Sequence, residues 1–287
     1  MSATGHHDRV RPRRRRPLRV EPSTLVLWGL SLFTVVFLVA PTVFVFLVSV
    51  SPDRFVTFPP SGVTLHWYRQ VAGEFAAATW LSVQLAFASM IVSIVLGLPA
   101  AYALVRGRPR GGDALDALFR SPLQIPHVVI GIGFLQYYLL IARTSGVELL
   151  STFAALLTAH CVVTVPFVVS AVATGLASSD PGLEDAAQGL GRGRVATFFL
   201  VTLPLLRPAV FAGAFFAFLV SFDNLPVSLF LAVAGQTPLP VAMFFEAEFS
   251  NTPTLYAMSA LISTASAGAI LLFDRIVGLR SVTNPVS

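Results

Sequence analysis

The chain has 287 residues, of which 55% are hydrophobic and 11% are charged, and its formal net charge is +5. An ordinary soluble domain carries about 25% charged residues, so this composition excludes a water-soluble globule. A single cysteine excludes an internal disulfide, and the absence of lysine excludes a phosphate-binding loop of the G-x-x-x-x-G-K-[ST] type. The composition therefore indicates an all-α integral membrane protein that does not itself bind ATP through such a loop.

The first 22 residues form a basic segment, with seven arginines between Arg9 and Arg19. Directly before a hydrophobic segment, such a run is expected to contact the anionic lipid of the inner leaflet rather than nucleic acid. We expect residues 1–22 to be a largely disordered cytoplasmic tail. The apolar run that follows, Leu25 to Val50, is too long for the hydrophobic region of a signal peptide, so it is predicted to be an uncleaved first span.

Six windows of the sequence are long and apolar enough to cross a bilayer, which takes about 20 residues. The predicted spans are residues 24–50, 78–105, 121–142, 150–174, 208–232 and 255–273. With the N terminus inside, sixteen of the 19 arginines are cytoplasmic, and only Arg54, Arg69 and Arg143 lie outside. The sequence therefore predicts a six-span protein with both termini in the cytoplasm.

The connection between the fourth and fifth spans is about thirty residues long and too patterned for a simple linker. Asp180 is expected to cap a short helix that has Pro181 at its first position and ends at Gly191, where positive φ is favourable. A second helix is expected from about Val195 to Val201, before the chain turns into the fifth span at Leu203 and Pro204. We call residues 178–204 the coupling segment.

The first of these two helices is amphipathic. Its apolar stripe follows the i, i+3, i+4, i+7 pattern and consists of Leu183, Ala186, Ala187 and Leu190. Its polar side consists of Glu184, Asp185 and Gln188. Small alanines suit a helix that fits a groove on another protein. A helix lying on lipid, with its acidic first turn complementing the helix dipole, explains the pattern equally well.

The spacing of Asp185, Ala186 and Ala187, then Gly191, then Val201, Leu203 and Pro204, resembles the EAA motif of ABC importer permeases. That motif reads E-A-A, three residues, G, nine residues, I-x-L-P. In that family it forms coupling helices that dock in a cleft of a cytoplasmic ATPase. The resemblance implies that coupling to the ATPase is carried by Glu184, Asp185, Ala186, Ala187, Gly191, Leu203 and Pro204. Because aspartate replaces the motif's glutamate at position 185, which of the two acids contacts the ATPase stays open.

The resemblance extends from about Ala78 to Ile276 and includes the segments Ala101–Arg106 and Ile125–Gly131. It implies the type I (MetI-like) importer fold with six transmembrane helices. Departures are Leu81 and His127, where the family usually has asparagine and a small residue. The implied organisation is a tail (1–22), a first helix with an outer loop (23–76), a transmembrane core (77–276) and a C-terminal tail (277–287).

The segment from Ser221 to Val241, SFDNLPVSLFLAVAGQTPLPV, is similar to the spermidine and putrescine branch of this family, apart from the extra Pro238. The resemblance implies a polyamine permease of the bacterial inner membrane. Ferric iron, another cation or an organic solute stay open as substrates. The implied partners are a cytoplasmic ABC ATPase dimer that uses ATP and magnesium, a second permease subunit, an extracytoplasmic solute-binding protein and membrane lipid. No cofactor is expected on this chain.

Asp223 is expected about fifteen residues into the fifth span, roughly 22 Å along the helix from its cytoplasmic end. A carboxylate at that depth is costly unless it faces a cavity or a partner, so Asp223 and its neighbour Asn224 are candidate pathway residues. The alternative is a helix-capping role. His160 lies mid-span, where it could relay protons in a secondary transporter or serve as a hydrogen-bonded structural residue. A secondary transporter leaves the coupling segment unexplained.

Overall fold

The computed structural model describes residues 22–55, 59–150, 152–233 and 235–277. The predicted disorder of the basic tail falls outside these residues. The described part is almost entirely helical and contains no named strand. Its helices are α1 (Pro22–Ser49), α2 (His66–Val105), α3 (Gly112–Arg120), η1 (Ser121–Leu123), α4 (His127–Ser145), α5 (Phe153–Ser178), α6 (Gly182–Gly189), α7 (Arg194–Thr197), η2 (Phe198–Thr202), α8 (Leu203–Phe222), α9 (Leu225–Leu231), α10 (Leu239–Phe249) and α11 (Pro253–Val277).

Within the described residues, six helices are long and apolar enough to span a membrane, which confirms the six predicted spans. Their bounds are Thr24–Ser49, His66–Val105, His127–Ser145, Phe153–Ser178, Arg194–Phe222 and Pro253–Arg275. A helix satisfies all of its internal backbone hydrogen bonds, which is why apolar segments in lipid take this form.

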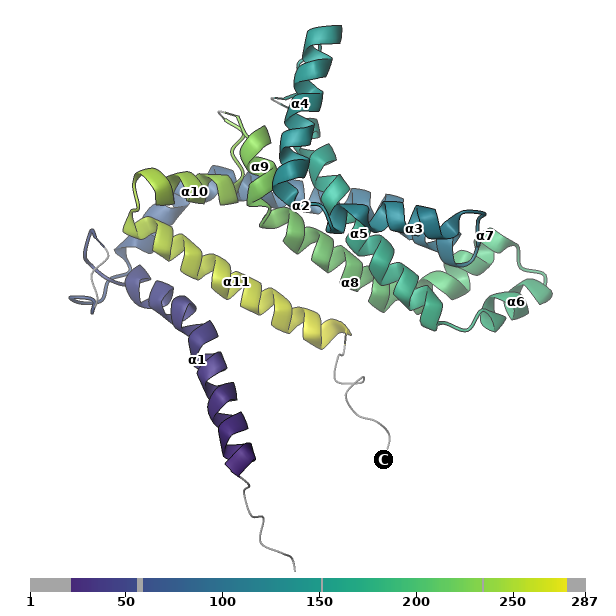
Figure 1. Ribbon diagram of the computed structural model, residues 1–287, viewed down its shortest axis with the longest axis horizontal. Helices are drawn as coiled ribbons and strands as arrows, with labels where there is room; N and C mark the ends of the chain where they lie inside the picture. Colours follow the sequence, from purple (N-terminus) through teal and green to yellow (C-terminus); the bar gives the residue numbers. More distant parts are fainter. Residues whose placement is uncertain (1–21, 56–58, 151, 234, 278–287) are drawn as a thin grey trace, which may run out of the picture.

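The core of the molecule consists of α2, α5 and α8, which lie side by side along the long axis (Figure 1). Val168 on α5 lies close to both other helices, because a Cβ at Gly97 of α2 would come within 3.0 Å of its side chain and a Cβ at Gly213 of α8 within 2.9 Å of its Cα. Small residues at such positions let membrane helices approach closely. All three helices therefore pack closely around Val168.

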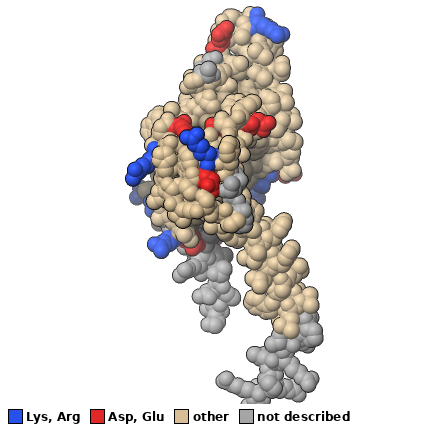
Figure 2. Space-filling view, turned by 90° about the vertical axis from the view of Figure 1, so that its left-hand side faces the viewer, with Lys and Arg blue, Asp and Glu red and all other residues tan. Residues whose placement is uncertain are grey.

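The outer helices α1 and α4 pack only loosely on the rest of the molecule. The helix α1 packs on α11, and nearly all of its side chains are exposed. In Figure 2 it is a column of tan residues without a charged side chain. The helix α4 packs against α9 and projects away from the bundle (Figure 1). Such apolar surface is suited to lipid or to another membrane subunit.

Three of the predicted spans have different bounds in the structure. The second span begins at His66 rather than residue 78, because α2 continues through Arg69 and Glu74, and its 40 residues are about 60 Å long. The expected division at residue 77 therefore falls inside α2. The third span begins after Pro126, because residues 121–123 form a separate 3₁₀ turn. The fifth span is Arg194–Phe222 instead of 208–232, and α9 follows it as a separate helix.

Candidate functional site

The short helix of the coupling segment forms as predicted. Asp180 caps its first turn, since the Gly182 N–H donates to Asp180 Oδ1 at 2.8 Å, and α6 begins one residue later than expected. The helix ends at Gly189, two residues before the predicted Gly191, whose φ is +87°. The Gly191 N–H donates to the Gln188 carbonyl at 2.9 Å, and the Arg192 N–H donates to the Ala187 carbonyl at 3.2 Å. These two bonds form a Schellman motif, which requires a residue in the left-handed region.

The apolar stripe of α6 is largely uncovered by the rest of the chain. Leu183 is 47% exposed and Leu190 is 87% exposed, while Ala186 is exposed and Ala187 half-buried. Asp185 is exposed beside the stripe and forms no ion pair with another described residue. The helix thus presents an apolar surface with one free carboxylate next to it.

Glu184 and Asp185 differ in burial, although the sequence groups both with the polar side of α6. The Glu184 side chain is buried and forms an ion pair with Arg106, whose Nε lies 3.0 Å from Glu184 Oε1. The Tyr102 hydroxyl donates to Glu184 Oε2 at 3.1 Å. A carboxylate taken out of water needs such partners, and two side chains near the end of α2 supply them. Sequence reasoning missed this contact because the ion-paired residues are 78 positions apart.

After Gly191 the chain enters a continuous helical path instead of a second helix followed by a turn. The helix α7 passes into the π-helical turn η2, and α8 begins at Leu203 without a break in helical backbone angles. Pro204 lies inside this continuous path, directly after the π-helical turn, so its missing N–H removes one hydrogen bond of the helix. Leu203 and Pro204 are half-buried within this path. The expected turn at these residues was therefore wrong.

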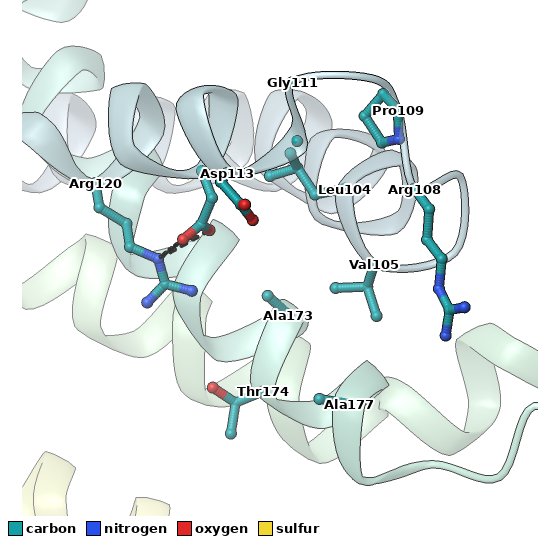
Figure 3. Close-up of a pocket in the computed structure, with 12 residues that line it drawn as sticks. Leu104, Val105, Arg108, Pro109, Gly111, Asp113, Arg120, Ala173, Thr174 and Ala177 are labelled. Atoms are coloured by element: carbon teal, nitrogen blue, oxygen red, sulfur yellow. Dashed lines mark hydrogen bonds and ion pairs between the residues drawn. The ribbon is translucent and has the colours of Figure 1, made fainter.

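A cavity of about 560 Å³ lies near the same end of the bundle, between the end of α2, α3 and α5 (Figure 3). Its charged lining residues include Arg108, Asp113 and Arg120. Arg120 pairs with Asp116, whose Oδ2 lies 2.8 Å from the Arg120 Nε (dashed lines in Figure 3). The charged connection after α2 thus lies close to the coupling segment.

Asp223 ends α8 instead of lying inside the fifth span, so its expected depth was wrong. Its side chain is exposed and makes no hydrogen bond or ion pair with another described residue. The protein around it still desolvates the carboxylate partly and raises the pKa of Asp223 above its ordinary value. A carboxylate without a partner at a helix break can accept a cation from outside the chain.

The side chain of Asn224 has a structural role as the cap of α9. Its side-chain oxygen accepts from the Val227 N–H at 3.1 Å, which caps α9, and its Nδ2 lies 3.4 Å from His127 Nδ1. Asn224 is 3% exposed. The sequence Asn224, Leu225, Pro226 indicates this capping role, because a cap residue followed closely by proline is typical of a helix start.

His160 is buried between three helices. Its Nδ1 lies 2.9 Å from Ser221 Oγ of α8, and its Nε2 lies 3.1 Å from Ser228 Oγ of α9. Both ring nitrogens therefore have a partner, and the histidine joins α5 to both sides of the α8–α9 break. This arrangement agrees with the structural interpretation of His160 better than with a proton relay.

Six apolar spans, three of which form the tight core, with a short exposed helix on one connection, define a polytopic membrane protein. The family model described as "Binding-protein-dependent transport system inner membrane component" matches residues 93–279. The chain belongs to this family.

Relatives with named transport systems match most of the chain. The putrescine transport system permease protein of Escherichia coli is 29% identical over 79% of this chain and 81% of its own length. The spermidine/putrescine permease of Haemophilus influenzae is 26% identical over 74% and 80%. The molybdate/tungstate permease of Pyrococcus abyssi is 27% identical over 67% and 75%.

Solved structures share the fold. A chain of a bacterial ABC transporter that imports the acidic polysaccharide alginate matches with a TM-score of 0.64 and 16% identity, over 88% of this chain and 94% of that one. A chain of the methionine transporter MetNI in inward-facing conformations matches with a TM-score of 0.56 and 20% identity, over 74% and 97%. The chain is thus a multi-pass inner-membrane permease subunit of an ABC importer with the MetI-like fold.

Proposed function

We propose that this permease imports polyamines such as putrescine and spermidine. Two relatives named as polyamine permeases support this proposal. The alignment with each covers about three quarters of this chain or more and at least 80% of the relative. The support from the structure is Asp223, an exposed carboxylate with no partner among the described residues. An alkyl diammonium ion would be stabilised there, whereas molybdate would be repelled.

The proposed coupling to ATP hydrolysis runs through α6. Its exposed apolar stripe and the free Asp185 carboxylate suit a cleft on a separate cytoplasmic ATPase, which would supply the ATP and magnesium chemistry. The observation that carries this proposal is the uncovered surface of Leu183, Ala186 and Leu190, held in place by the Schellman motif at Gly191.

The remaining partners follow from the same assignment. A second permease subunit would complete the pathway, and a solute-binding protein would deliver the polyamine on the outer side. The coupling segment and the arginines after α2 lie at one end of the molecule, since Arg106 touches Glu184. Together with the arginine distribution, this supports a cytoplasmic position for that end and for both termini.

The test is transport by the reconstituted complex. The chain would be co-expressed with the ATPase, permease and binding protein encoded by neighbouring genes, purified and placed in liposomes. Putrescine or spermidine is expected to stimulate ATP hydrolysis and to accumulate in an ATP-dependent manner. Stimulation by molybdate or ferric iron alone, with none by either polyamine, would refute the substrate assignment.

A further inference from the structure

Arg106, the C-cap residue of α2, connects three helices. Its Nε donates to Glu184 Oε1 of α6 at 3.0 Å, and its Nη2 donates to Ser179 at the end of α5, to Oγ at 2.6 Å and to the carbonyl at 3.3 Å. The Arg106 and Glu184 side chains are only 16% and 10% exposed. An ion pair this sheltered from water is geometrically specific, and loss of one partner leaves an uncompensated charge.

Tyr102 lies one helical turn before Arg106 and contacts the coupling segment on both sides of Gly191, at α6 and at η2. Its hydroxyl donates to Glu184 Oε2 at 3.1 Å, so each carboxylate oxygen of Glu184 has its own donor from α2. Its ring meets Phe198 edge to face, with the centroids 5.2 Å apart. Phe198 is the first residue of η2, so α2 holds the segment both before and after Gly191.

We propose that Tyr102, Arg106, Ser179 and Glu184 form a clamp that makes α2 follow the movement of α6. The inference rests on the proposed docking of α6 on an ATPase. In the sequence, α6 is joined to the bundle only through α5 before it and α7 after it. The clamp adds a third route through α2, which at 40 residues is the longest helix in the part of the chain that the structure describes.

The other half of α2, away from Arg106, contacts α10 and α11. Ser82, midway along α2, accepts a hydrogen bond from the Leu239 N–H at 2.8 Å, at the start of α10. Val71 and Phe75 of α2 pack with Leu239 and Met258 in a buried cluster. A displacement of α6 that is passed to Arg106 therefore reaches α10 and α11 through one helix. In this arrangement Glu184 is a positioning residue inside the permease, and Asp185 is left for the ATPase.

The first experiment measures the clamp itself, independently of transport. Spin labels at Gln188→Cys on α6 and Arg110→Cys after α2, both exposed positions, would report the distance between the two elements in a Cys161→Ala background. The distance distribution is expected to be narrow with the native clamp and broad after Glu184→Gln or Arg106→Gln. An equally narrow distribution in both variants would overturn the clamp whatever the protein transports.

The second experiment measures its role in the purified, reconstituted complex, as putrescine transported per ATP hydrolysed. Glu184→Gln and Arg106→Gln are each expected to lower this ratio about 2- to 30-fold, and the double variant to be no worse than either single one. Asp116→Asn, which breaks the exposed pair on α3, is the matched control and should leave the ratio unchanged.

Where Glu184→Gln fails to assemble, Tyr102→Phe decides, because it removes one hydrogen bond and keeps the ring. A ratio that falls in Tyr102→Phe supports the clamp. A normal ratio in the assembled clamp variants, or strictly additive losses, would overturn it. A native complex without polyamine-dependent ATP hydrolysis would instead refute the proposed function. The spin-label distances would still test the clamp, because they do not depend on transport.

Discussion

Glu184 and Asp185 are neighbours in the chain, yet their carboxylates lie in different environments. Glu184 is 7% exposed and ion-paired with Arg106, whereas Asp185 is exposed and has no ion-pair partner among the described residues. The motif resemblance left open which acid faces the ATPase. The structure favours Asp185 for an intermolecular contact and Glu184 for an intramolecular one.

This difference predicts that Asp185→Arg weakens binding of the ATPase, because it reverses the one free charge beside the apolar stripe of α6. Co-purification of the ATPase with the permease is expected to fall by about tenfold, the effect of losing one charge-assisted contact of about 1.5 kcal/mol. Quantitative pull-down from detergent-solubilised membranes would measure it. Asp113→Arg, at an exposed acid on α3, provides the control, and equal losses from both substitutions would argue against a specific contact.

Gly191→Val is expected to disturb the end of α6. A β-branched residue at φ +87° costs about 1–3 kcal/mol in backbone strain, although a Cβ there would meet nothing within 4 Å. The variant should reach the membrane at normal abundance but lose most polyamine uptake, as measured with radiolabelled putrescine. Gly189→Ala, inside the same helix and equally unobstructed, should transport normally. Normal uptake in Gly191→Val would show that the Schellman motif is dispensable.

Asp223→Asn tests the proposed cation contact through pH. Because partial burial raises the pKa of Asp223, its charge is lost at a higher pH than that of an ordinary aspartate. Putrescine uptake by the native protein should therefore decline as the pH falls through this raised pKa. The asparagine variant should transport weakly, without the decline that belongs to this group. An unchanged rate and pH profile in the variant would remove Asp223 from the pathway.

The same raised pKa makes a prediction about stability. The folded state binds the proton more tightly than the unfolded state does, so ionisation of Asp223 at neutral pH opposes folding. Asp223→Asn should therefore raise the thermal unfolding temperature slightly at neutral pH. The gain should fade in acid, once the native carboxyl is protonated as well. A variant that is less stable than the native protein at neutral pH would show that the carboxylate has a stabilising partner.

Sequence patterns predicted the features that depend on local physics. The six spans follow from hydrophobicity, and the positive φ of Gly191 just after α6 follows from the conformational freedom of glycine. The start of α2 was missed because charged residues such as Arg69 and Glu74 extend a helix beyond the apolar window. The pairing of Arg106 with Glu184 was missed because sequence contains no distances between remote residues.

His160 bridges the break between α8 and α9. Its two ring nitrogens hold Ser221 and Ser228 on either side of the break, so His160→Ala should leave both hydroxyls without this partner. Hydrogen bonds between membrane helices contribute about 0.6 kcal/mol each, so the loss should lower the thermal unfolding temperature by a few degrees. His160→Gln keeps an amide that can bond a serine, and it should retain ATP-driven uptake. A fully assembled His160→Gln variant without uptake would instead indicate that the imidazole itself takes part in transport, as a proton relay requires.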